Sequence, residues 1–235
     1  PSDEGNAISS NNNEKIITII NEYYELTISS IGGGSIIKYI LSGQDKNGAY
    51  NYMGTFNEAG LYGDENPVIL SHPIMNNGCS PCLSINNGVY KFRDNFLLNN
   101  YNDMDTVFLT NTHSKNLVLE YNYTLNNGDY IKKSMEFSPN SYEINSSFEY
   151  NLKKSFPHSN IEIHWDSGIA PTELNSYDEA TYSGAYVYQN NKIDYIVQSG
   201  ESAISSEIFN AQTDWVAIRN KFFTVALIPT IKADY

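Results

Sequence analysis

The clearest pattern along the chain is an alternation of apolar and polar residues that begins near residue 117. Apolar side chains recur at every second position in 117–125 and again in 131–137, and Asn-Asn-Gly-Asp at 126–129 stands between them. A period of two indicates a β-strand with one buried face, and Asn-Gly readily adopts the positive φ of a tight turn. The pattern therefore predicts a β-hairpin, in which Lys133 shares the apolar face of Ile131, Met135 and Phe137.

Similar alternations occur on both sides of this hairpin. Residues 142–152 alternate over one long strand, and the strands predicted at 185–188 and 193–197 flank a Gln-Asn-Asn-Lys turn. No segment of twelve or more residues has a helical period, whereas residues 42–82 show little period and are predicted to be an irregular surface excursion. Short strands separated by turn sequences predict an all-β, antiparallel sandwich with little helix.

Three consecutive glycines, Gly32 to Gly34, interrupt a strand predicted at 24–29 before apolar residues resume at 36–41. A glycine cluster can cradle a phosphate, but that motif continues with Lys-Ser or Lys-Thr at the start of a helix. Neither feature follows here, so the glycines are predicted to form the turn of a second hairpin.

The longest apolar run near the C-terminus is residues 214–229. Trp215, Ile218 and Phe222 are three and four residues apart, which suits one face of a short helix, and apolar residues from Phe223 to Pro229 then follow at period two. We therefore expect a strand, a helical turn and a second strand, with a core formed by Trp215, Phe222, Phe223 and Pro229. Trp165 and Trp215 are both expected to be largely buried.

The composition limits the possible partners. The 235 residues suit one large all-β domain better than two small ones, and the net charge of −13 disfavours binding to nucleic acid or to anionic lipid headgroups. No apolar run is long enough to span a bilayer. Residues 1–13 are small and polar and are predicted to be a flexible tether, which leaves 14–235 as the folded domain.

Cys79 and Cys82 are the only cysteines, in the sequence Cys-Ser-Pro-Cys. A redox-active pair normally opens a helix, and a zinc site needs two further ligands, yet neither a helical pattern nor a second Cys-x-x-Cys is present. The two remaining alternatives are a loop-closing disulfide and two free thiols. An oxidising compartment would favour the disulfide.

One group of residues could carry chemistry. Glu162, His164 and Asp166 lie two residues apart, so on a strand they would share one face, where they could bind a metal or transfer protons. The simpler interpretation is the wet face of a strand whose other face, with Ile161, Ile163 and Trp165, is buried. Because no nucleophile with a neighbouring base and no cofactor motif is visible, we expect no catalytic residues, no metal and no cofactor.

The apolar run at 214–229 also resembles a known family. Its sequence Trp-Val-Ala-Ile-Arg-Asn-Lys-Phe-Phe-Thr-Val-Ala-Leu-Ile-Pro is similar to a block in the periplasmic domain of YidC-type membrane protein insertases, of the YidC/Oxa/Alb family. Residues 24–36 resemble the start of that domain, where a strand is followed by a glycine turn and a second strand. Residues 164–173 resemble a Trp-Asp-x-Gly segment of the family. The three blocks follow the family's order.

This resemblance implies a β-supersandwich fold like that of galactose mutarotases, and a non-catalytic periplasmic domain of an inner-membrane insertase and chaperone. The expected partners are nascent membrane proteins and components of the Sec translocon. The family's domain continues past the Ile-Pro of this block, so we expect its last strands and helices to be missing here. The alternative is a sugar-binding or mutarotase-like protein, but the histidine pair and carboxylate that mutarotases need cannot be matched to residues of this chain.

Overall fold

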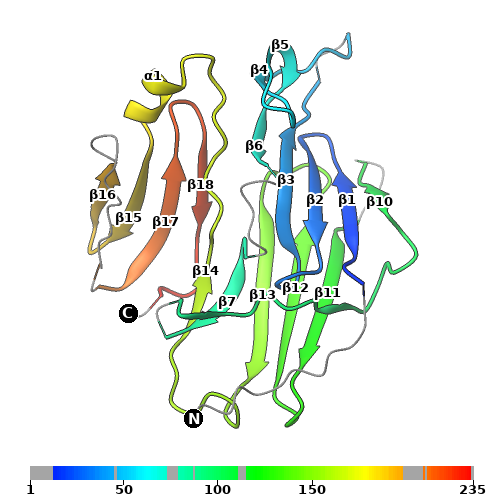
Figure 1. The fold of residues 1–235 in the computed structure, drawn as a ribbon, viewed down its shortest axis with the longest axis vertical. Coiled ribbons are helices and arrows are strands. Elements are labelled where there is room, and N and C mark those ends of the chain that lie inside the picture. The colour runs from blue at the N-terminus through cyan, green and yellow to red at the C-terminus, as the bar shows by residue number, and fades with distance from the viewer. Residues whose placement is uncertain are drawn as a thin grey trace. The chain divides into compact units, whose positions relative to one another are not determined.

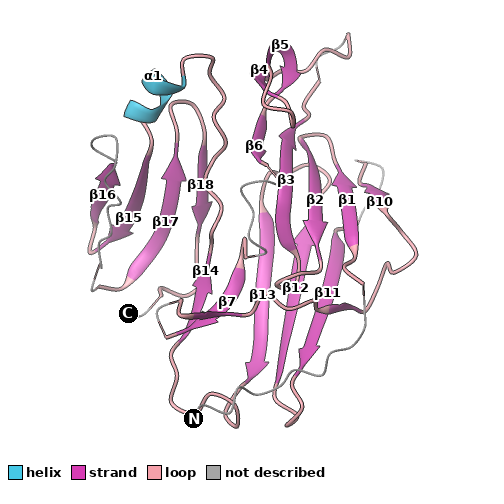
Figure 2. Ribbon diagram, viewed as in Figure 1, coloured by secondary structure: helices cyan, strands magenta, loops and turns pink. Residues whose placement is uncertain are grey.

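The structure is a computed structural model that describes residues 13–44, 47–72, 79–86, 88–110, 115–197, 209 and 211–233. The fold is all-β, as expected, and the described residues contain one short helix, α1 (Ser176–Thr181) (Figures 1 and 2). Among these residues, no helix has the length and apolar character needed to cross a bilayer. Residues 1–12, which form nearly all of the predicted tether, lie outside the described residues.

The chain divides into two compact units. Unit 1 consists of Pro1–Tyr52 and Ser71–Ser167, and unit 2 consists of Met53–Leu70 and Gly168–Tyr235. Strand β6 (Ile69–Ser71) spans the boundary between them along the chain.

The first sheet of unit 1 contains the predicted glycine hairpin. Its five strands follow the order β10 (Thr106–Phe108), β1 (Ile16–Ile20), β2 (Tyr24–Ser29), β3 (Ser35–Leu41) and β6. β1, β2 and β3 pair antiparallel, whereas β10 pairs parallel with β1. The prediction of a purely antiparallel fold was therefore wrong. β10 is far enough from β1 in sequence for the long connection that a parallel pair needs.

The glycine turn allows a close approach between backbone and core. Gly34 has a φ of +93°, and a Cβ atom there would lie 2.6 Å from Met135 Sδ and 2.8 Å from Tyr121 Cε2. Only glycine combines this conformation with this contact. The cluster is thus a hairpin turn with a packing role, as the sequence indicated, and not a phosphate loop.

The second sheet of unit 1 confirms the hairpin predicted from the alternation. Its strands follow the order β13 (Ile144–Asn151), β12 (Tyr130–Phe137), β11 (Leu117–Thr124) and β9 (Leu97–Leu98). β11 and β12 pair antiparallel from Leu117 opposite Phe137 to Thr124 opposite Tyr130, and Gly128 in the turn has a φ of +85°. Lys133 is buried on the apolar face, as the pattern predicted.

One core fills unit 1. Both sheets contribute to the same cluster of buried residues, with β7 (Cys82–Ile85) of a third sheet, which has the order β14 (Ile161–His164), β7 and β8 (Tyr90–Lys91). The cluster includes Ile17, Ile19, Leu26, Ile28, Leu83, Ile85, Leu119, Tyr121, Ile131, Met135 and Phe137. The two larger sheets are therefore held together by apolar burial, the dominant favourable contribution to folding.

Unit 2 contains a two-stranded sheet and a four-stranded sheet. The first pairs β4 (Met53–Phe56) with β5 (Tyr62–Pro67), and the second has the order β16 (Lys192–Val197), β15 (Gly184–Gln189), β17 (Thr213–Arg219) and β18 (Thr224–Leu227). The predicted turn at 189–192 is confirmed, with positive φ at Asn190 and Asn191. Across both units the described strands form five sheets, more than the two of the simple sandwich that the strand pattern predicted.

The expected helical turn in the apolar run at 214–229 was wrong. Residues 213–227 form the β17–β18 hairpin, in which Arg219 pairs with Thr224. Asn220 makes the turn, because its Oδ1 accepts hydrogen bonds from the backbone N–H groups of Phe222 (3.1 Å) and Phe223 (2.8 Å). These side-chain bonds compete with a helix and favour a turn.

The aromatic residues of this run are less buried than predicted. Trp215 is half-buried and stacks on Tyr188, with ring centroids 5.7 Å apart, whereas Phe222 at the hairpin tip is 59% exposed. Phe223 and Pro229 are half-buried. Trp165 is also half-buried, although it packs against the core of unit 1.

Candidate functional site

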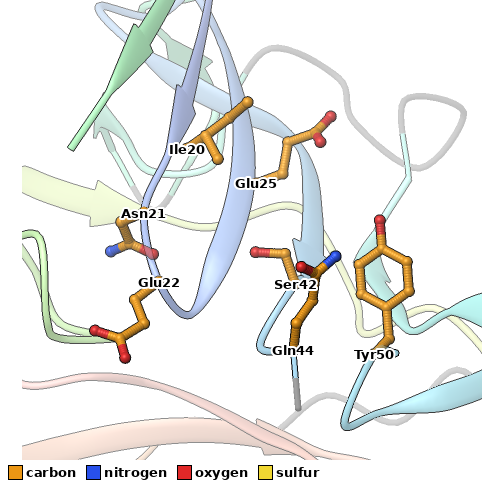
Figure 3. Close-up of a pocket in the computed structure, with 7 residues that line it drawn as sticks. All are labelled: Ile20, Asn21, Glu22, Glu25, Ser42, Gln44 and Tyr50. Carbon is orange, nitrogen blue, oxygen red and sulfur yellow. The ribbon is translucent and has the colours of Figure 1, made fainter. Parts of the chain in front are cut away.

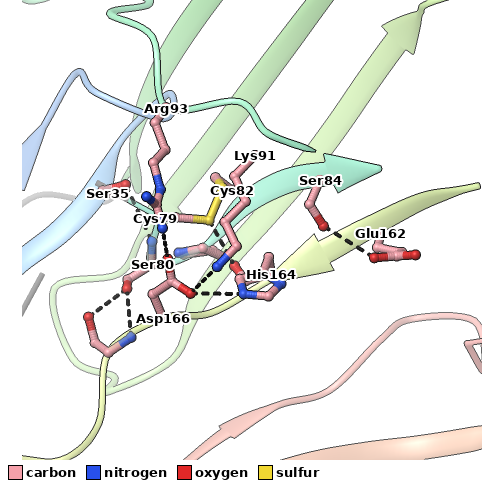
Figure 4. Close-up of a disulfide and its surroundings, with 12 residues drawn as sticks. Ser35, Cys79, Ser80, Cys82, Ser84, Lys91, Arg93, Glu162, His164 and Asp166 are labelled. Atoms are coloured by element: carbon pink, nitrogen blue, oxygen red, sulfur yellow. Dashed lines mark hydrogen bonds and ion pairs between the residues drawn. A yellow bond between two sulfur atoms is a disulfide. The ribbon is translucent and has the colours of Figure 1, made fainter. Parts of the chain in front are cut away.

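The predicted group at 162–166 lies where β14 runs beside the disulfide. β14 pairs antiparallel with β7, which places His164 opposite Cys82 and Glu162 opposite Ser84. Asp166 lies just beyond the strand, and its backbone N–H donates to the carbonyl of Cys79 over 2.8 Å. The end of β14 is thereby fixed against the disulfide loop (Figure 4).

The carboxylate of Asp166 is the centre of an ion cluster. Its Oδ1 accepts a hydrogen bond from Lys91 Nζ at 2.6 Å and lies 2.8 Å from His164 Nε2, and its Oδ2 accepts a hydrogen bond from Arg93. Lys91 and Arg93 come from β8 and the residues after it, on the far side of β7 from β14. The sequence analysis missed both, because nothing in the spacing of Lys91 and Arg93 distinguishes them from the other closely spaced basic residues of the chain.

Glu162 does not join this cluster. Its Oε2 accepts a hydrogen bond from Ser84 Oγ over 3.3 Å, and Figure 4 shows it along the strand, away from Asp166. The apolar side of the strand also differs from the prediction, because Ile163 is 57% exposed. The structure thus brings His164 and Asp166 together and leaves Glu162 apart.

This arrangement suits an ion-pair network better than proton transfer. Burial alone would raise the pKa of Asp166, but hydrogen bonds from Lys91 and Arg93 outweigh burial and hold that pKa below its usual range. A carboxylate with a lowered pKa is a weak base, and its oxygens are already occupied by cations that would repel a metal ion. In the described ranges, no group of three histidine, cysteine or acidic side chains is arranged to hold a metal.

The cysteines themselves form a disulfide, which decides between the two alternatives left by the sequence. Cys79 and Cys82 are joined, and neither side chain has exposed surface. Within this loop, Ser80 Oγ lies 2.6 Å from Ser167 Oγ and accepts a hydrogen bond from the N–H of Ser167. A disulfide so enclosed is inaccessible to a partner thiol, so the loop has a structural role.

A second polar centre lies in unit 2, at the turn of the β17–β18 hairpin. Glu179 on α1 is 3% exposed, and its carboxylate accepts hydrogen bonds from Asn220 Nδ2 (2.7 Å) and from both the N–H and the hydroxyl of Thr172. Asn220 therefore both forms the hairpin turn and fastens it to α1. Periodicity could not reveal this contact, because its partners are about 40 residues apart in sequence.

Comparison with known proteins identifies the family. A family model for the YidC periplasmic domain matches residues 98–235, more than half of the chain. The match includes the blocks at 164–173 and 214–229, while the block at 24–36 lies outside it. The resemblance noted in the sequence is thus confirmed over the C-terminal part of the chain.

Individual relatives agree with this assignment. The membrane protein insertase YidC of Chlorobium limicola is 30% identical over 122 residues, which are 50% of this chain and 20% of that protein. The corresponding proteins of Chlorobium luteolum and Chlorobium phaeovibrioides are 30% and 26% identical, over 47% and 51% of this chain and 19% and 21% of their own lengths.

The chain thus spans about a fifth of the length of the curated relatives it matches. These relatives are named as protein insertases rather than as enzymes, and the matched model describes a periplasmic domain, which locates the chain in the periplasm. Because the family model matches more than half of its residues, the chain belongs to the YidC periplasmic domain family.

Proposed function

We propose that this chain is a non-catalytic periplasmic module of an inner-membrane protein insertase. The module assists the insertion and folding of membrane proteins, alone or with the Sec translocon, by transient contact with extended segments of nascent membrane proteins. Residues 14–235 form the module and residues 1–13 its tether. The family match carries this proposal, since it assigns a periplasmic domain of an insertase.

We also propose that the sheets belong to the β-supersandwich type. Two observations support this, namely the single core shared by the two larger sheets of unit 1 and the predominance of antiparallel pairs. A crystal structure of the chain tests this proposal, since the supersandwich type requires large antiparallel sheets packed face to face and any other packing would contradict it.

The edge of β13 is the surface that best suits contact with an extended chain. β13 has eight residues, of which six are exposed, and in the described part of the chain it pairs only with β12. It contains neither proline nor lysine, which commonly protect sheet edges, and its one charged side chain, Glu149, is engaged by Lys132 and Tyr130. A free edge of this length can accept an added strand through backbone hydrogen bonds.

A substitution at this edge tests the proposal. Ser147→Lys places a charge on exposed β13, whereas Thr124→Lys places the same charge at an exposed position of β11, which lies inside the sheet. We expect Ser147→Lys to weaken binding of a fluorescent peptide of alternating apolar and polar residues, and Thr124→Lys to leave it unchanged. Equal binding by both variants, or no binding at millimolar peptide, would argue against strand addition at β13.

The second candidate, a sugar-binding or mutarotase-like protein, gains no support from the site. Three partners already engage the carboxylate of Asp166, which makes it a poor acceptor for a sugar hydroxyl. Acceleration of α-glucose mutarotation by the purified chain, lost in His164→Ala, would reverse this preference.

A further inference from the structure

Strand β13 has two unlike faces. Residues directly opposite each other in an antiparallel pair share a face of the sheet. Opposite the buried residues of β12, which lie on the core side, β13 carries Ile144, Ser146, Phe148 and Tyr150. Its other face consists of exposed polar residues, namely Asn145, Ser147, Glu149 and Asn151. Three of the four core-side residues are apolar, so this edge strand is apolar on one side and polar on the other.

The apolar side of β13 is only partly covered by the rest of unit 1. Ile144 and Phe148 are half-buried and pack against the core, whereas Tyr150 is 46% exposed. The ring of Phe148 is held from the core side, because Lys133 Nζ lies 5.3 Å from its centre in a cation–π contact. The apolar layer of the core therefore continues onto the edge strand and ends there with exposed aromatic surface.

Both ends of β13 are fastened to neighbouring turns. Asn21 in the β1–β2 turn is buried, and its Nδ2 donates to the carbonyls of Ser138 (2.9 Å) and Ser141 (3.2 Å), in the connection that leads into β13. Figure 3 shows Asn21 at this turn, on the wall of a small pocket. Just after β13, the N–H of Ser155 donates to Asp129 Oδ2 over 2.6 Å. The edge is thus held extended before anything binds, which lowers the entropy cost of adding a strand.

The two faces of β13 favour one pattern in an added strand. Side chains of the new strand would lie about 5 Å from those directly opposite in β13. Apolar side chains beside Phe148 and Tyr150 would extend the core layer and leave water. On the other face, beside Ser147, the new side chains stay in water. Because successive side chains of a strand alternate between faces, a segment with strictly alternating apolar and polar residues fits best.

The chemistry of the edge favours a polypeptide segment as its occupant. An edge strand presents unpaired backbone N–H and C=O groups, and another strand satisfies both kinds in register. A second copy of this chain is disfavoured, because each copy carries a net charge of −13 and like charges repel.

We propose that Phe148 and Tyr150 make the β13 edge selective for extended segments that are apolar on one face only. This proposal rests on the strand addition proposed above and adds the class of segment and the residues that select it. A uniformly apolar segment, of the kind that forms a transmembrane helix, would leave half of its side chains exposed beside the polar face of β13. The edge therefore prefers amphipathic segments to membrane-spanning ones.

Two fluorescent peptides of identical composition test this selectivity. Each contains four valines and four serines between the same terminal lysines. The residues alternate in the first peptide and follow in pairs in the second, so that only two of its valines can share a face. By fluorescence anisotropy, we expect the alternating peptide to bind about tenfold more tightly, because it buries two more valines beside Phe148 and Tyr150.

Two threonine substitutions show which face of β13 selects the peptide. Tyr150→Thr removes the exposed ring on the core side, and Asn151→Thr changes the next residue, on the polar face. Tyr150→Thr should weaken binding of the alternating peptide about threefold, the scale of one cross-strand pair. Asn151→Thr should leave it unchanged. Both side chains are exposed, and unchanged hydrogen exchange of β12 in the peptide-free variants checks that both fold.

The outcomes separate this proposal from strand addition itself. If the two peptides bind equally and both protect the amides of β13, strand addition stands and the selectivity is overturned. Equal effects of Tyr150→Thr and Asn151→Thr would overturn the selectivity as well. If neither peptide binds at millimolar concentration, both proposals are wrong. A dimer of the peptide-free chain in sedimentation, dissociated by the alternating peptide, would assign the edge to a second copy and overturn the proposal.

Discussion

Lys133 Nζ lies 2.7 Å from the carbonyl oxygen of Pro81, to which it donates a hydrogen bond. The same ammonium donates to the carbonyl of Gly34 over 3.1 Å and lies 5.3 Å from the centre of the Phe148 ring. Lys133 is only 1% exposed. A buried amino group thus ties β12 to the disulfide loop and to the glycine turn, and no carboxylate in the described part of the chain pairs with it.

This lysine should make stability depend on pH. Burial lowers the pKa of Lys133 to about 7, whereas the unfolded chain keeps the ordinary value near 10.5. Between these two pH values the unfolded state binds more protons, so the free energy of unfolding should rise with pH, by about 2 kcal/mol from pH 7 to pH 9. Urea unfolding at the two pH values measures this rise.

Two methionine substitutions show whether the rise belongs to Lys133. Lys133→Met should remove it, because the buried ionisable group is gone. Lys132→Met changes a neighbouring lysine with 52% side-chain exposure and should preserve it. If the Lys133→Met protein showed the wild-type rise, another group would be responsible.

Replacing Gly34 by alanine should destabilise unit 1. The methyl group would meet Met135 and Tyr121 at less than 3 Å, on a backbone with a φ of +93°. Conformational strain and overpacking together should cost about 2–4 kcal/mol. Gly48→Ala is a matched control, because Gly48 has a φ of +81° but no atom within 4 Å of the added carbon, so that only strain acts there. The free energy of unfolding of both variants is measured by urea unfolding. A similar decrease in both would contradict the packing role of Gly34.

Asn220→Asp should loosen the contact between the β17–β18 turn and α1. The substitution replaces an amide that donates to Glu179 over 2.7 Å with a second carboxylate, and like charges at this distance repel. Asn220→Ala loses the hydrogen bonds without adding a charge. At neutral pH Asn220→Asp should therefore be the less stable variant, as followed by tryptophan fluorescence during urea unfolding. Equal stability of Asn220→Asp and Asn220→Ala would rule out charge repulsion as the cause.

The elements that the sequence predicted best are those specified locally. The hairpin around Gly128 and the turn at Asn190 need only alternation and residues that tolerate positive φ, and both formed as expected. Lys133 was placed correctly on the apolar face for the same reason. Its acceptors at Gly34 and Pro81 could not be predicted, because they depend on contacts between residues far apart in sequence.

The predictions that were wrong also concern contacts between residues far apart in sequence, or side-chain hydrogen bonds that periodicity does not reveal. The spacing of Trp215, Ile218 and Phe222 indicated a helix, but the side chain of Asn220 stabilises a turn and leaves Phe222 at an exposed tip. The surface excursion predicted at 42–82 likewise contains Val68 and Ile69, which are buried although no period marks them. At the candidate site, Lys91 and Arg93 meet Asp166 only because β7 brings β8 and β14 into one sheet.

We propose that this YidC-family domain contacts extended polypeptide through the free edge of β13. Hydrogen exchange of the purified chain, with and without a saturating alternating peptide, tests it most directly. Half of the β13 amides should point to the open edge and should gain protection when the peptide adds as a strand, while the amides of β11, inside the sheet, should not change. Binding of the peptide without added protection in β13 would contradict the claim.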